Sequence, residues 1–321
     1  MAQVTSAFRP HFSDGNAFRP HGDVQVAPDG TLWTSDGYAL LALDRTGVVQ
    51  RVLGAERDAD VFGKIAALMV GPGDRLYAVD RRTGSVHVFD DTGRRLHVCE
   101  PSAEDFADEL VQRWLTVSDA GEVLLSGGAS KGLVRFGANG ERLGIDSLTP
   151  AETSQKWYAQ PGTGRTWVVG RSSVLLKEPD GRVVRSIERA PDGTGLRGLV
   201  EAAVARDGSI AVCSVEASFG GRVSSRLLVC SAEGETTSSH DLPPEFVTDR
   251  PFAFDGRRLA CLLWDSGGNT TSLGLLALET RVVRYAVLER SGVHWTPAFS
   301  AGGNELWLFD GDRRVERYRL D

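Results

Sequence analysis

The sequence contains few of the residues from which disulfides and thiolate metal sites are built. Cysteine occurs only four times among 321 residues, and no two cysteines form a C-x-x-C pair. Each lies in or beside an apolar, strand-like run, where an unpaired thiol behaves as a small hydrophobic side chain. This usage predicts buried free thiols and fits a reducing cytoplasm. The four positions are Cys99, Cys213, Cys230 and Cys261.

Long apolar runs and an excess of positive charge are also missing. No apolar run approaches the roughly 18 residues that a membrane-spanning helix needs, and the N-terminal stretch MAQVTSAFRPHF lacks the pattern of a secretory signal. The formal net charge is −7, whereas nucleic-acid binding normally needs a basic surface. We therefore expect a cytoplasmic protein with neither a membrane nor a nucleic acid as its partner.

Catalytic and metal-binding motifs are scarce as well. The six histidines include no H-x-x-x-H or H-E-x-x-H spacing. No Ser-His-Asp arrangement, phosphate loop or zinc pattern stands out. His87 and His97 fall within predicted strands of one repeat, and we expect both side chains to be exposed.

Glycine, by contrast, is abundant, and it marks a repeat along the whole chain. Two-strand units with a turn between them recur, for example VQVAPDGTLWTSD and ALMVGPGDRLYAVD. Glycine suits these turns because it tolerates positive φ. The turn glycines, 43 to 48 residues apart, are Gly30, Gly73, Gly121, Gly164, Gly208, Gly256 and Gly303.

Two more strands follow each pair, as in GSVHVFDDTGRRLHVCE. Four strands in a period of roughly 45 residues are typical of a propeller blade. The sequence therefore predicts an all-β protein, a seven-bladed β-propeller with four antiparallel strands per blade, in one domain covering residues 1–321. The expected blades span approximately 22–60, 61–105, 112–150, 156–192, 200–243, 250–290, and 295–321 together with 3–9.

The last unit stops at Asp321 after three strands, while the segment QVTSAF near the N-terminus precedes the first blade without a partner. We expect this N-terminal strand to complete and close the last blade, because closure removes exposed sheet edges.

One end of the blades is expected to carry the binding site. The first strand of each blade should line a central channel, starting on the side where the blade connections and the turns between strands two and three lie. Two of these connections, residues 101–113 and 148–155, show helix-start signals, with Ser102 and Asp105 resembling a capping box. Long connections on one side of a rigid scaffold favour binding there.

Tryptophan and basic residues gather at the expected mouth of this channel. Trp114 and Trp157 each lie seven residues before their turn glycine, so we expect them at equivalent positions. Tryptophan offers apolar area and an N–H donor, and arginine and lysine bind carboxylate or phosphate. The alternative is that the indoles wedge between blades and the cations are solvated. The candidate binding residues are Arg113, Trp114, Lys156, Trp157, Arg250, His294 and Trp295.

Two further sets are interpreted as structural. Asp36, Asp80 and Asp310 each end a second strand, where aspartate accepts backbone N–H bonds and sets the following turn. Aromatic residues recur at one place in the second strand, three positions before these aspartates in three of the blades, and we expect them in the core between blades. The recurring aromatic residues are Trp33, Tyr77, Trp167 and Trp307.

The blades resemble known propeller repeats. ALMVGPGDRLYAVDRRTGSVHVFDDTGRRLHV resembles an NHL-type repeat, VAPDGTLWTSDGYALLALDRTGVV is similar to repeats of streptogramin lyase-like propellers, and AFSAGGNELWLFD resembles a TolB-type unit. The resemblance implies the fold, which these families share while performing different functions. Enzymatic relatives of the gluconolactonase type hold a divalent metal with a Glu, an Asp and Asn side chains, but the four Asn here all fall in predicted turns or loops.

We therefore expect a non-catalytic binding propeller that presents its Trp- and Arg/Lys-lined mouth to a protein or peptide partner, or to a small anionic ligand. No cofactor is expected. The alternative is a small-molecule hydrolase or lyase that uses the channel, assisted by Ca²⁺ or Mg²⁺. His294 and Glu201 are then the catalytic candidates, and Asp23 and Glu201 the metal-ligand candidates.

Overall fold

The computed structural model describes the chain in two compact units, and each unit is treated by itself. The N-terminal unit contains residues 6–154 and 309–317, and the C-terminal unit contains residues 1–5, 155–308 and 318–321. The described residues are 3–8, 25–53, 64–102, 105, 114–126, 132–147, 156–161, 163–217, 223–243, 252–264, 270–280, 282–287, 295–299, 304–310 and 314–320.

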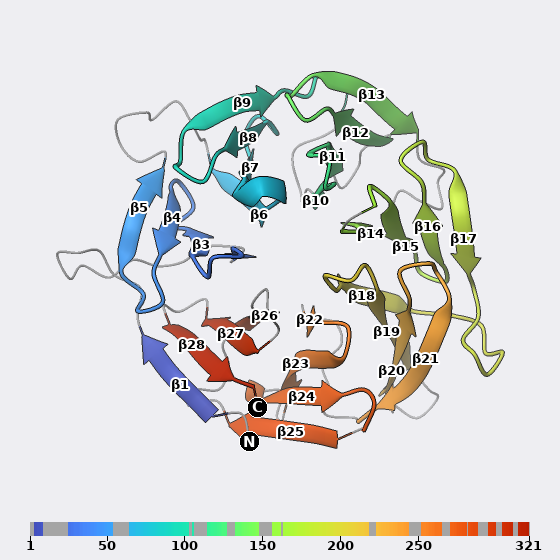
Figure 1. Ribbon diagram of the computed structural model, residues 1–321. Coiled ribbons are helices and arrows are strands. Elements are labelled where there is room, and N and C mark those ends of the chain that lie inside the picture. Colours follow the sequence, from blue (N-terminus) through green and yellow to red (C-terminus); the bar gives the residue numbers. More distant parts are fainter. Residues whose placement is uncertain are drawn as a thin grey trace. The chain divides into compact units, whose positions relative to one another are not determined.

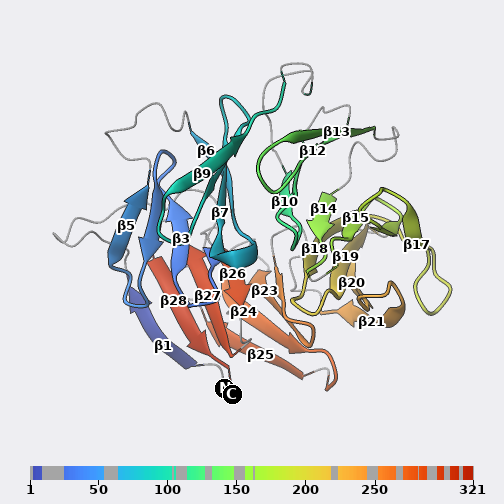
Figure 2. The same ribbon diagram turned by 45° about the horizontal axis from the view of Figure 1, so that its top comes forward.

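The protein is all-β and has seven blades, each a sheet of four antiparallel strands (Figures 1 and 2). The helical content of the described residues is one 3-10 turn, Pro72–Asp74. The predicted helices over 101–113 and 148–155 lie almost entirely outside the described residues. The described members of the predicted capping box, Ser102 and Asp105, do contact each other, because the Ser102 backbone N–H donates to the Asp105 carboxylate (2.7 Å).

The first three blades belong to the N-terminal unit, and in each of them the strands follow one another in sequence order across the sheet. Blade one has β2 (Gln25–Val26), β3 (Leu32–Ser35), β4 (Leu40–Leu43) and β5 (Val49–Leu53). Blade two has β6 (Ile65–Val70), β7 (Leu76–Asp80), β8 (Val86–Phe89) and β9 (Arg95–Cys99). Blade three has β10 (Trp114–Val117), β11 (Val123–Ser126), β12 (Gly132–Phe136) and β13 (Arg142–Ser147).

The next three blades belong to the C-terminal unit and have the same strand order. Blade four has β14 (Lys156–Ala159), β15 (Thr166–Val169), β16 (Val174–Lys177) and β17 (Val183–Ile187). Blade five has β18 (Leu199–Val204), β19 (Ile210–Ala217), β20 (Val223–Cys230) and β21 (Thr236–Leu242). Blade six has β22 (Ala253–Phe254), β23 (Arg258–Trp264), β24 (Thr270–Ala277) and β25 (Val282–Val287).

The seventh sheet combines both ends of the chain. It contains β26 (Trp295–Phe299), β27 (Glu305–Asp310), β28 (Arg314–Arg319) and the N-terminal β1 (Gln3–Phe8), in the order β1-β28-β27-β26. That the N-terminal strand closes the propeller in this way stays a prediction, as does the single domain, because the strands of this sheet are divided between the two units.

The turn glycines adopt the backbone conformation that the repeat predicted. All six of them within the described residues have positive φ, for example 86° at Gly208, and a side chain would strain this conformation. The structure therefore confirms why glycine recurs at this place in blades one to six.

The cores lie between successive blades, as the recurring aromatic residues predicted. Trp33 packs in the cluster of blades one and two, Tyr77 in that of blades two and three, and Trp167 in that of blades four and five. These three side chains and Trp307 are all buried. The four cysteines are also buried and unpaired, and burial raises the pKa of the Cys99 and Cys230 thiols to about 12.

One expectation about surface residues is wrong. His87 is only 7% exposed, since β8 is an interior strand of its sheet and all four of its residues are buried. Burial, followed by the charge of Arg95, lowers the pKa of His87. His97, on the outer strand β9, is half-buried.

The predicted turn-setting role of aspartate is confirmed in the first two blades. The Asp36 carboxylate accepts the N–H groups of Tyr38 and Ala39. The Asp80 carboxylate accepts those of Arg82 and Thr83. No helix among the described residues is long and apolar enough to cross a membrane.

Candidate functional site

The first strands of successive blades contact one another within each unit. In the C-terminal unit β14 contacts β18, β18 contacts β22, and β22 contacts β26; β14 and β18 lie side by side in both views (Figures 1 and 2). These strands are where the sequence placed the candidate site, so side chains from different blades can meet there.

A backbone link fixes where these first strands begin. The N–H of Leu199, the first residue of β18, donates to the carbonyl of Arg171 in the β15–β16 turn (3.1 Å). The same link recurs between blades one and two, where Ile65 at the start of β6 donates to Gly37 in the β3–β4 turn (2.8 Å). In both pairs the turn between strands two and three of one blade therefore lies at the starting end of the next blade's first strand, as predicted.

At the starting ends of β14 and β18, three side chains form a polar cluster, Lys156, Tyr158 and Glu201. Lys156 Nζ lies 2.7 Å from Glu201 Oε2, and Tyr158 Oη donates to Glu201 Oε1 (3.0 Å). The Ala202 N–H also donates to Oε1 (3.2 Å). Both carboxylate oxygens of Glu201 are thus engaged.

Strand geometry explains why these residues meet. Side chains two apart on a strand share a face, so Lys156 and Tyr158 both point toward blade five, where Glu201 lies. The pairing of β18 with β19 shifts between Leu199 and Glu201, which leaves Val200 as the extra residue of a β-bulge. Its carbonyl accepts a hydrogen bond from Lys156 Nζ (2.8 Å). The bulge therefore adds a second acceptor for the lysine.

The cluster is charge-compensated and only partly exposed to solvent. The side chains of Lys156 and Glu201 are 25% and 14% exposed, so water screens their attraction only in part. Burial, together with the charge of Glu201 and the hydrogen bond to it, raises the pKa of Tyr158 well above its usual value. The tyrosine therefore stays a neutral donor next to one positive and one negative group.

Trp157 belongs to the other face of β14. Its side chain is 6% exposed, and its indole Nε1 has no hydrogen-bond partner among the residues that the structure describes. The ammonium group of Lys177 lies 5.0 Å from the ring centroid, within the range of a cation–π contact. The ring is thus buried, and its contact with Lys177 lies within blade four.

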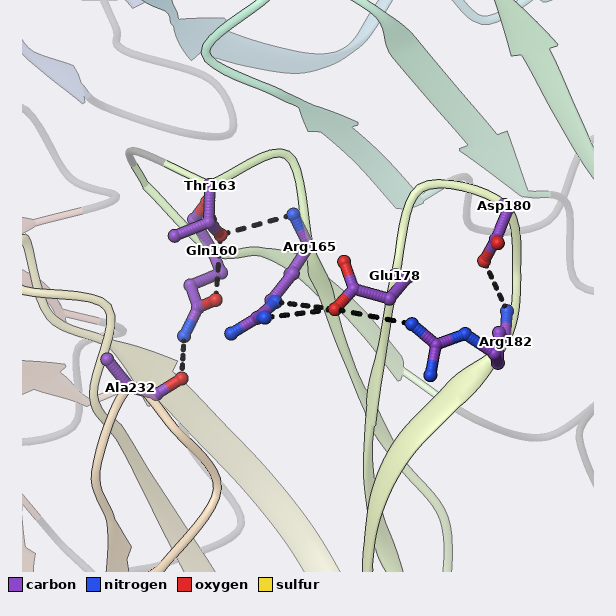
Figure 3. Close-up of polar contacts among 7 residues, drawn as sticks. All are labelled: Gln160, Thr163, Arg165, Glu178, Asp180, Arg182 and Ala232. Atoms are coloured by element: carbon purple, nitrogen blue, oxygen red, sulfur yellow. Dashed lines mark hydrogen bonds and ion pairs between the residues drawn. The ribbon is translucent and has the colours of Figure 1, made fainter.

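The other end of β14 is anchored to blade five by Gln160, which is completely buried. Its Nε2 donates to the carbonyls of Gly208 (3.1 Å) and Ala232 (2.5 Å), in two turns of blade five. Its Oε1 accepts a hydrogen bond from the Thr163 hydroxyl (2.7 Å) (Figure 3). Since β14 is tied to blade five at both ends, the polar cluster sits on a rigid strand pair.

The same close-up shows how the turns of blade four are held. The Glu178 carboxylate lies between Arg165 (2.9 Å) and Arg182 (4.0 Å), and Asp180 accepts the Arg182 N–H (Figure 3). These pairs lie at the end of the blade away from the polar cluster and connect residues of blade four alone.

The structure describes only some of the predicted site residues. Lys156, Trp157 and Glu201 are described with their side chains, and Lys156 and Glu201 are brought together. Trp114 and Trp295 are the first residues of β10 and β26. The predicted positions Arg113, Arg250, His294 and Asp23 lie outside the described residues.

The expected equivalence of Trp114 and Trp157 does not hold. Trp114 pairs with Ser126 at the end of β11, whereas the residue that pairs with the end of β15, Val169, is Lys156. The reason is that the β14–β15 turn is one residue longer than the β10–β11 turn. Counting back from the turn glycine therefore matched Trp114 with Trp157, whereas the residue equivalent to Trp114 in the strand pairing is Lys156.

Tyr158 was missed by the sequence analysis. The signal for it was the two-residue period, because a residue two positions after Lys156 must share its face. Among the described residues there is no group of three or more His, Cys, Asp or Glu side chains that could hold a metal ion. Glu201 is the one metal-ligand candidate that the structure describes.

Comparisons with known proteins identify the fold. No family model and no curated protein matches the sequence. Among solved structures, a virginiamycin B lyase from Staphylococcus aureus is similar over 100% of both chains, with a TM-score of 0.70 and 10% identity. A streptogramin B lyase is similar over 94% of this chain and 93% of its own (TM-score 0.65, 12% identity).

A third neighbour is the Pan2 WD40 domain of Neurospora crassa, with a TM-score of 0.65 and 10% identity over 94% of this chain and 89% of that chain. The neighbours thus include both lyases and a WD40 domain. The structure confirms the resemblance to streptogramin lyase-like propellers at the level of the fold, and this chain shares their seven-bladed architecture.

Proposed function

We propose that this chain is a binding propeller, which presents the starting ends of its first strands to a protein or peptide partner. The observation that carries the proposal is the state of Glu201. Its two oxygens accept hydrogen bonds from Tyr158, Lys156 and the Ala202 backbone. A general base needs an oxygen that can reach the substrate proton, and a carboxylate engaged in this way is better suited to fixing a surface than to proton transfer.

The cluster also favours one kind of ligand over another. The sequence alone suggested either a peptide or a small anion at Lys156. Because Glu201 already neutralises the Lys156 ammonium, an incoming anion would have to displace a carboxylate held at 2.7 Å. A peptide, which offers both donors and acceptors, can bond to the cluster without breaking the pair. We therefore favour a peptide segment of a protein partner.

The other candidate residues stay part of the proposal. We propose that Arg113, Trp114, Arg250, His294 and Trp295 also contact the partner, since arginine and tryptophan dominate many protein interfaces. Trp157, buried on the other face of β14, stabilises this strand. The four unpaired cysteines support a cytoplasmic location for this interaction.

Two matched variants test the proposal. Lys156→Gln with Glu201→Gln removes both charges and keeps hydrogen-bonding groups in place. Arg185→Gln with Glu235→Gln does the same to an ion pair between the outer strand of blade four and the β20–β21 turn of blade five, with side chains 54% and 63% exposed. Peptides of 12 residues selected from a random library against the unmodified protein serve as probes, and fluorescence anisotropy gives their Kd values.

We expect the Lys156/Glu201 variant to raise the Kd of the selected peptides at least tenfold. The Arg185/Glu235 variant should raise it less than twofold. Equal affinities for the three proteins, or a selection that yields no binder, would contradict the proposal. Circular dichroism shows whether each variant retains its fold.

The alternative is that the chain is a hydrolase or lyase like the neighbours of the lyase class, with Ca²⁺ or Mg²⁺ assistance. Of its candidates, Asp23 and His294 lie outside the described residues, and Glu201 is engaged by three donors. Elemental analysis of the purified protein and thermal unfolding with EDTA test this function. A stoichiometric metal whose removal lowers the unfolding temperature would favour it.

A further inference from the structure

A second group of side chains, in blades one and two, has the features of a binding surface. Tyr38 lies in the β3–β4 turn, Arg81 and Arg82 lie in the β7–β8 turn, and Lys64 precedes β6. We call these four residues the cation patch. All belong to the N-terminal unit, and none is among the residues predicted to line the mouth.

Backbone hydrogen bonds bring these four residues together. The Arg81 N–H donates to the carbonyl of Lys64 (2.5 Å), and the N–H of Ile65 donates to the carbonyl of Gly37, the residue before Tyr38 (2.8 Å). Lys64 and Arg81 are thus bonded to each other, and Tyr38 and Arg82 are the next residues along the chain from Gly37 and Arg81. The patch is a consequence of the same turn-to-strand link that positions the first strands.

The turns that carry the patch are preorganised. Asp36 accepts the N–H of Tyr38 itself, and Asp80 accepts the N–H of Arg82. The Asp80 carbonyl also accepts the Gly84 N–H (2.8 Å). Rigid turns lose little conformational entropy when a ligand binds, which favours affinity.

The aromatic ring and the two arginines of the patch are available to a ligand. Tyr38 is 64% exposed, the largest exposed fraction among the described large hydrophobic residues, and Arg81 and Arg82 are exposed. Within the described part of the chain, the three cations of the patch make no ion pair. Arginines elsewhere are commonly paired, for example Arg142 with Asp105 and Arg258 with Asp255.

Among the described residues, two acids lie in the same turns as the patch, and both carboxylates face their own backbone. The Asp80 residue is only 2% exposed and its carboxylate points into its own turn, and the Asp36 carboxylate likewise accepts two N–H groups of its turn. Arg81 and Arg82 are exposed and Lys64 is half-buried, so three cations against these two inward-facing carboxylates leave a local excess of positive charge on a chain whose formal net charge is −7.

We infer that the cation patch binds an acidic segment of a partner protein, rich in Asp and Glu. Arginine bonds carboxylates in bidentate geometry, and Tyr38 offers an aromatic ring and a hydroxyl to the segment between its carboxylates. A nucleic acid is the less suitable polyanion, since binding a phosphate backbone normally needs a larger basic surface than three cations.

The test uses a fluorescein-labelled peptide of 12 residues with alternating Glu and Gly, and the same peptide with Gln in place of Glu. Fluorescence anisotropy measures binding at low and at physiological salt. We expect the Glu peptide to bind and the Gln peptide not to bind. Arg81→Ala with Arg82→Ala should raise the Kd of the Glu peptide at least tenfold, and Tyr38→Ala should raise it about threefold.

The matched control is Arg94→Ala with Arg95→Ala, which removes the same charge from the end of the β8–β9 turn and the first residue of β9, at the opposite end of β8. We expect it to change the affinity less than twofold. The Lys156→Gln/Glu201→Gln variant should also bind the Glu peptide normally, which separates this inference from the proposed function.

Three results would each overturn the inference. They are the absence of binding to the unmodified protein, an equal loss in the Arg94/Arg95 control, and tighter binding of a 12-nucleotide single-stranded oligonucleotide than of the Glu peptide. Circular dichroism confirms that the variants fold, and Arg81→Gln with Arg82→Gln replaces the alanine pair if that variant does not.

Discussion

Lys156 Nζ lies 2.7 Å from Oε2 of Glu201, so an ion pair joins the first strands of blades four and five. A second ion pair, Arg185 with Glu235, joins the outer strand β17 of blade four to the β20–β21 turn of blade five at 2.5 Å. The two pairs have similar lengths but different exposure, and this difference should decide how much each one stabilises the protein.

We expect the inner pair to contribute more to stability. Glu201→Gln should lower the free energy of unfolding by about 1–3 kcal/mol, since it weakens hydrogen bonds to a charged and partly buried group. Glu235→Gln should change it by less than about 1 kcal/mol, because exposed ion pairs are screened. Urea unfolding of the single variants, and a double-mutant cycle with Lys156→Met, measures both; equal effects would contradict this ranking.

Gln160 should be hard to replace despite its neutral side chain. Gln160→Met keeps the volume but removes the donor to the carbonyls of Gly208 and Ala232. The Ala232 carbonyl would lose this bond, and a buried polar group left without a partner costs about 1–3 kcal/mol. Urea unfolding gives the value. Thr163→Val, which removes only the hydroxyl bonded to Gln160 Oε1, should have a smaller effect, and the reverse order would show that the amide is not the anchor.

Trp157 should tolerate phenylalanine better than alanine. Trp157→Phe removes an indole N–H that has no partner among the described residues but leaves a smaller aromatic ring in place, so the loss of stability should be small. Trp157→Ala removes a buried ring and should cost about 3–5 kcal/mol. Thermal and urea unfolding of both variants tests the contrast. A large loss in the phenylalanine variant would mean that the N–H makes a necessary contact.

Asp90 should contribute to stability against acid. The hydroxyl of Thr92, with further hydrogen bonds from Arg94 and the Thr92 backbone, lowers the pKa of Asp90 to about 2. A carboxyl whose folded-state pKa lies below its unfolded value stabilises the fold above the unfolded pKa, and this contribution disappears as the pH falls toward 2. Asp90→Asn should therefore reduce the loss of stability between pH 5 and pH 3, measured by urea unfolding.

The neighbouring Asp91 provides the control for this experiment. Its backbone carbonyl accepts a hydrogen bond from Arg51, and substitution of its side chain leaves that bond in place. Asp91→Asn should therefore keep the acid dependence of the unmodified protein. An identical change in both variants would indicate a general effect of net charge.

The sequence predicted the fold because the information for it is local. The turn glycines need positive φ, and the strands between them repeat at an even period, so the number of blades and their order followed from the pattern. The buried aromatic residues Trp33, Tyr77 and Trp167 were predicted for the same reason. His87 was assigned wrongly because alternation within a strand does not show that its sheet is covered on both faces.

The candidate site was predicted less completely. Counting from the glycines brought Lys156 and Glu201 to the same end of their blades, but it could not show that they pair. That contact depends on the bulge at Val200, which has no signal in the sequence. Trp114 and Trp157 differ by one position in the strand pairing because the β14–β15 turn has one additional residue. A count that assumes a fixed turn length cannot detect this difference.

The link from the β3–β4 turn to β6, and its counterpart from the β15–β16 turn to β18, uses main-chain atoms alone. Substitutions in these turns can therefore alter what a blade presents to its surroundings without removing the bond that sets its neighbour. A propeller built in this way can acquire new specificities one turn at a time, and proteins that share little sequence can keep the same frame.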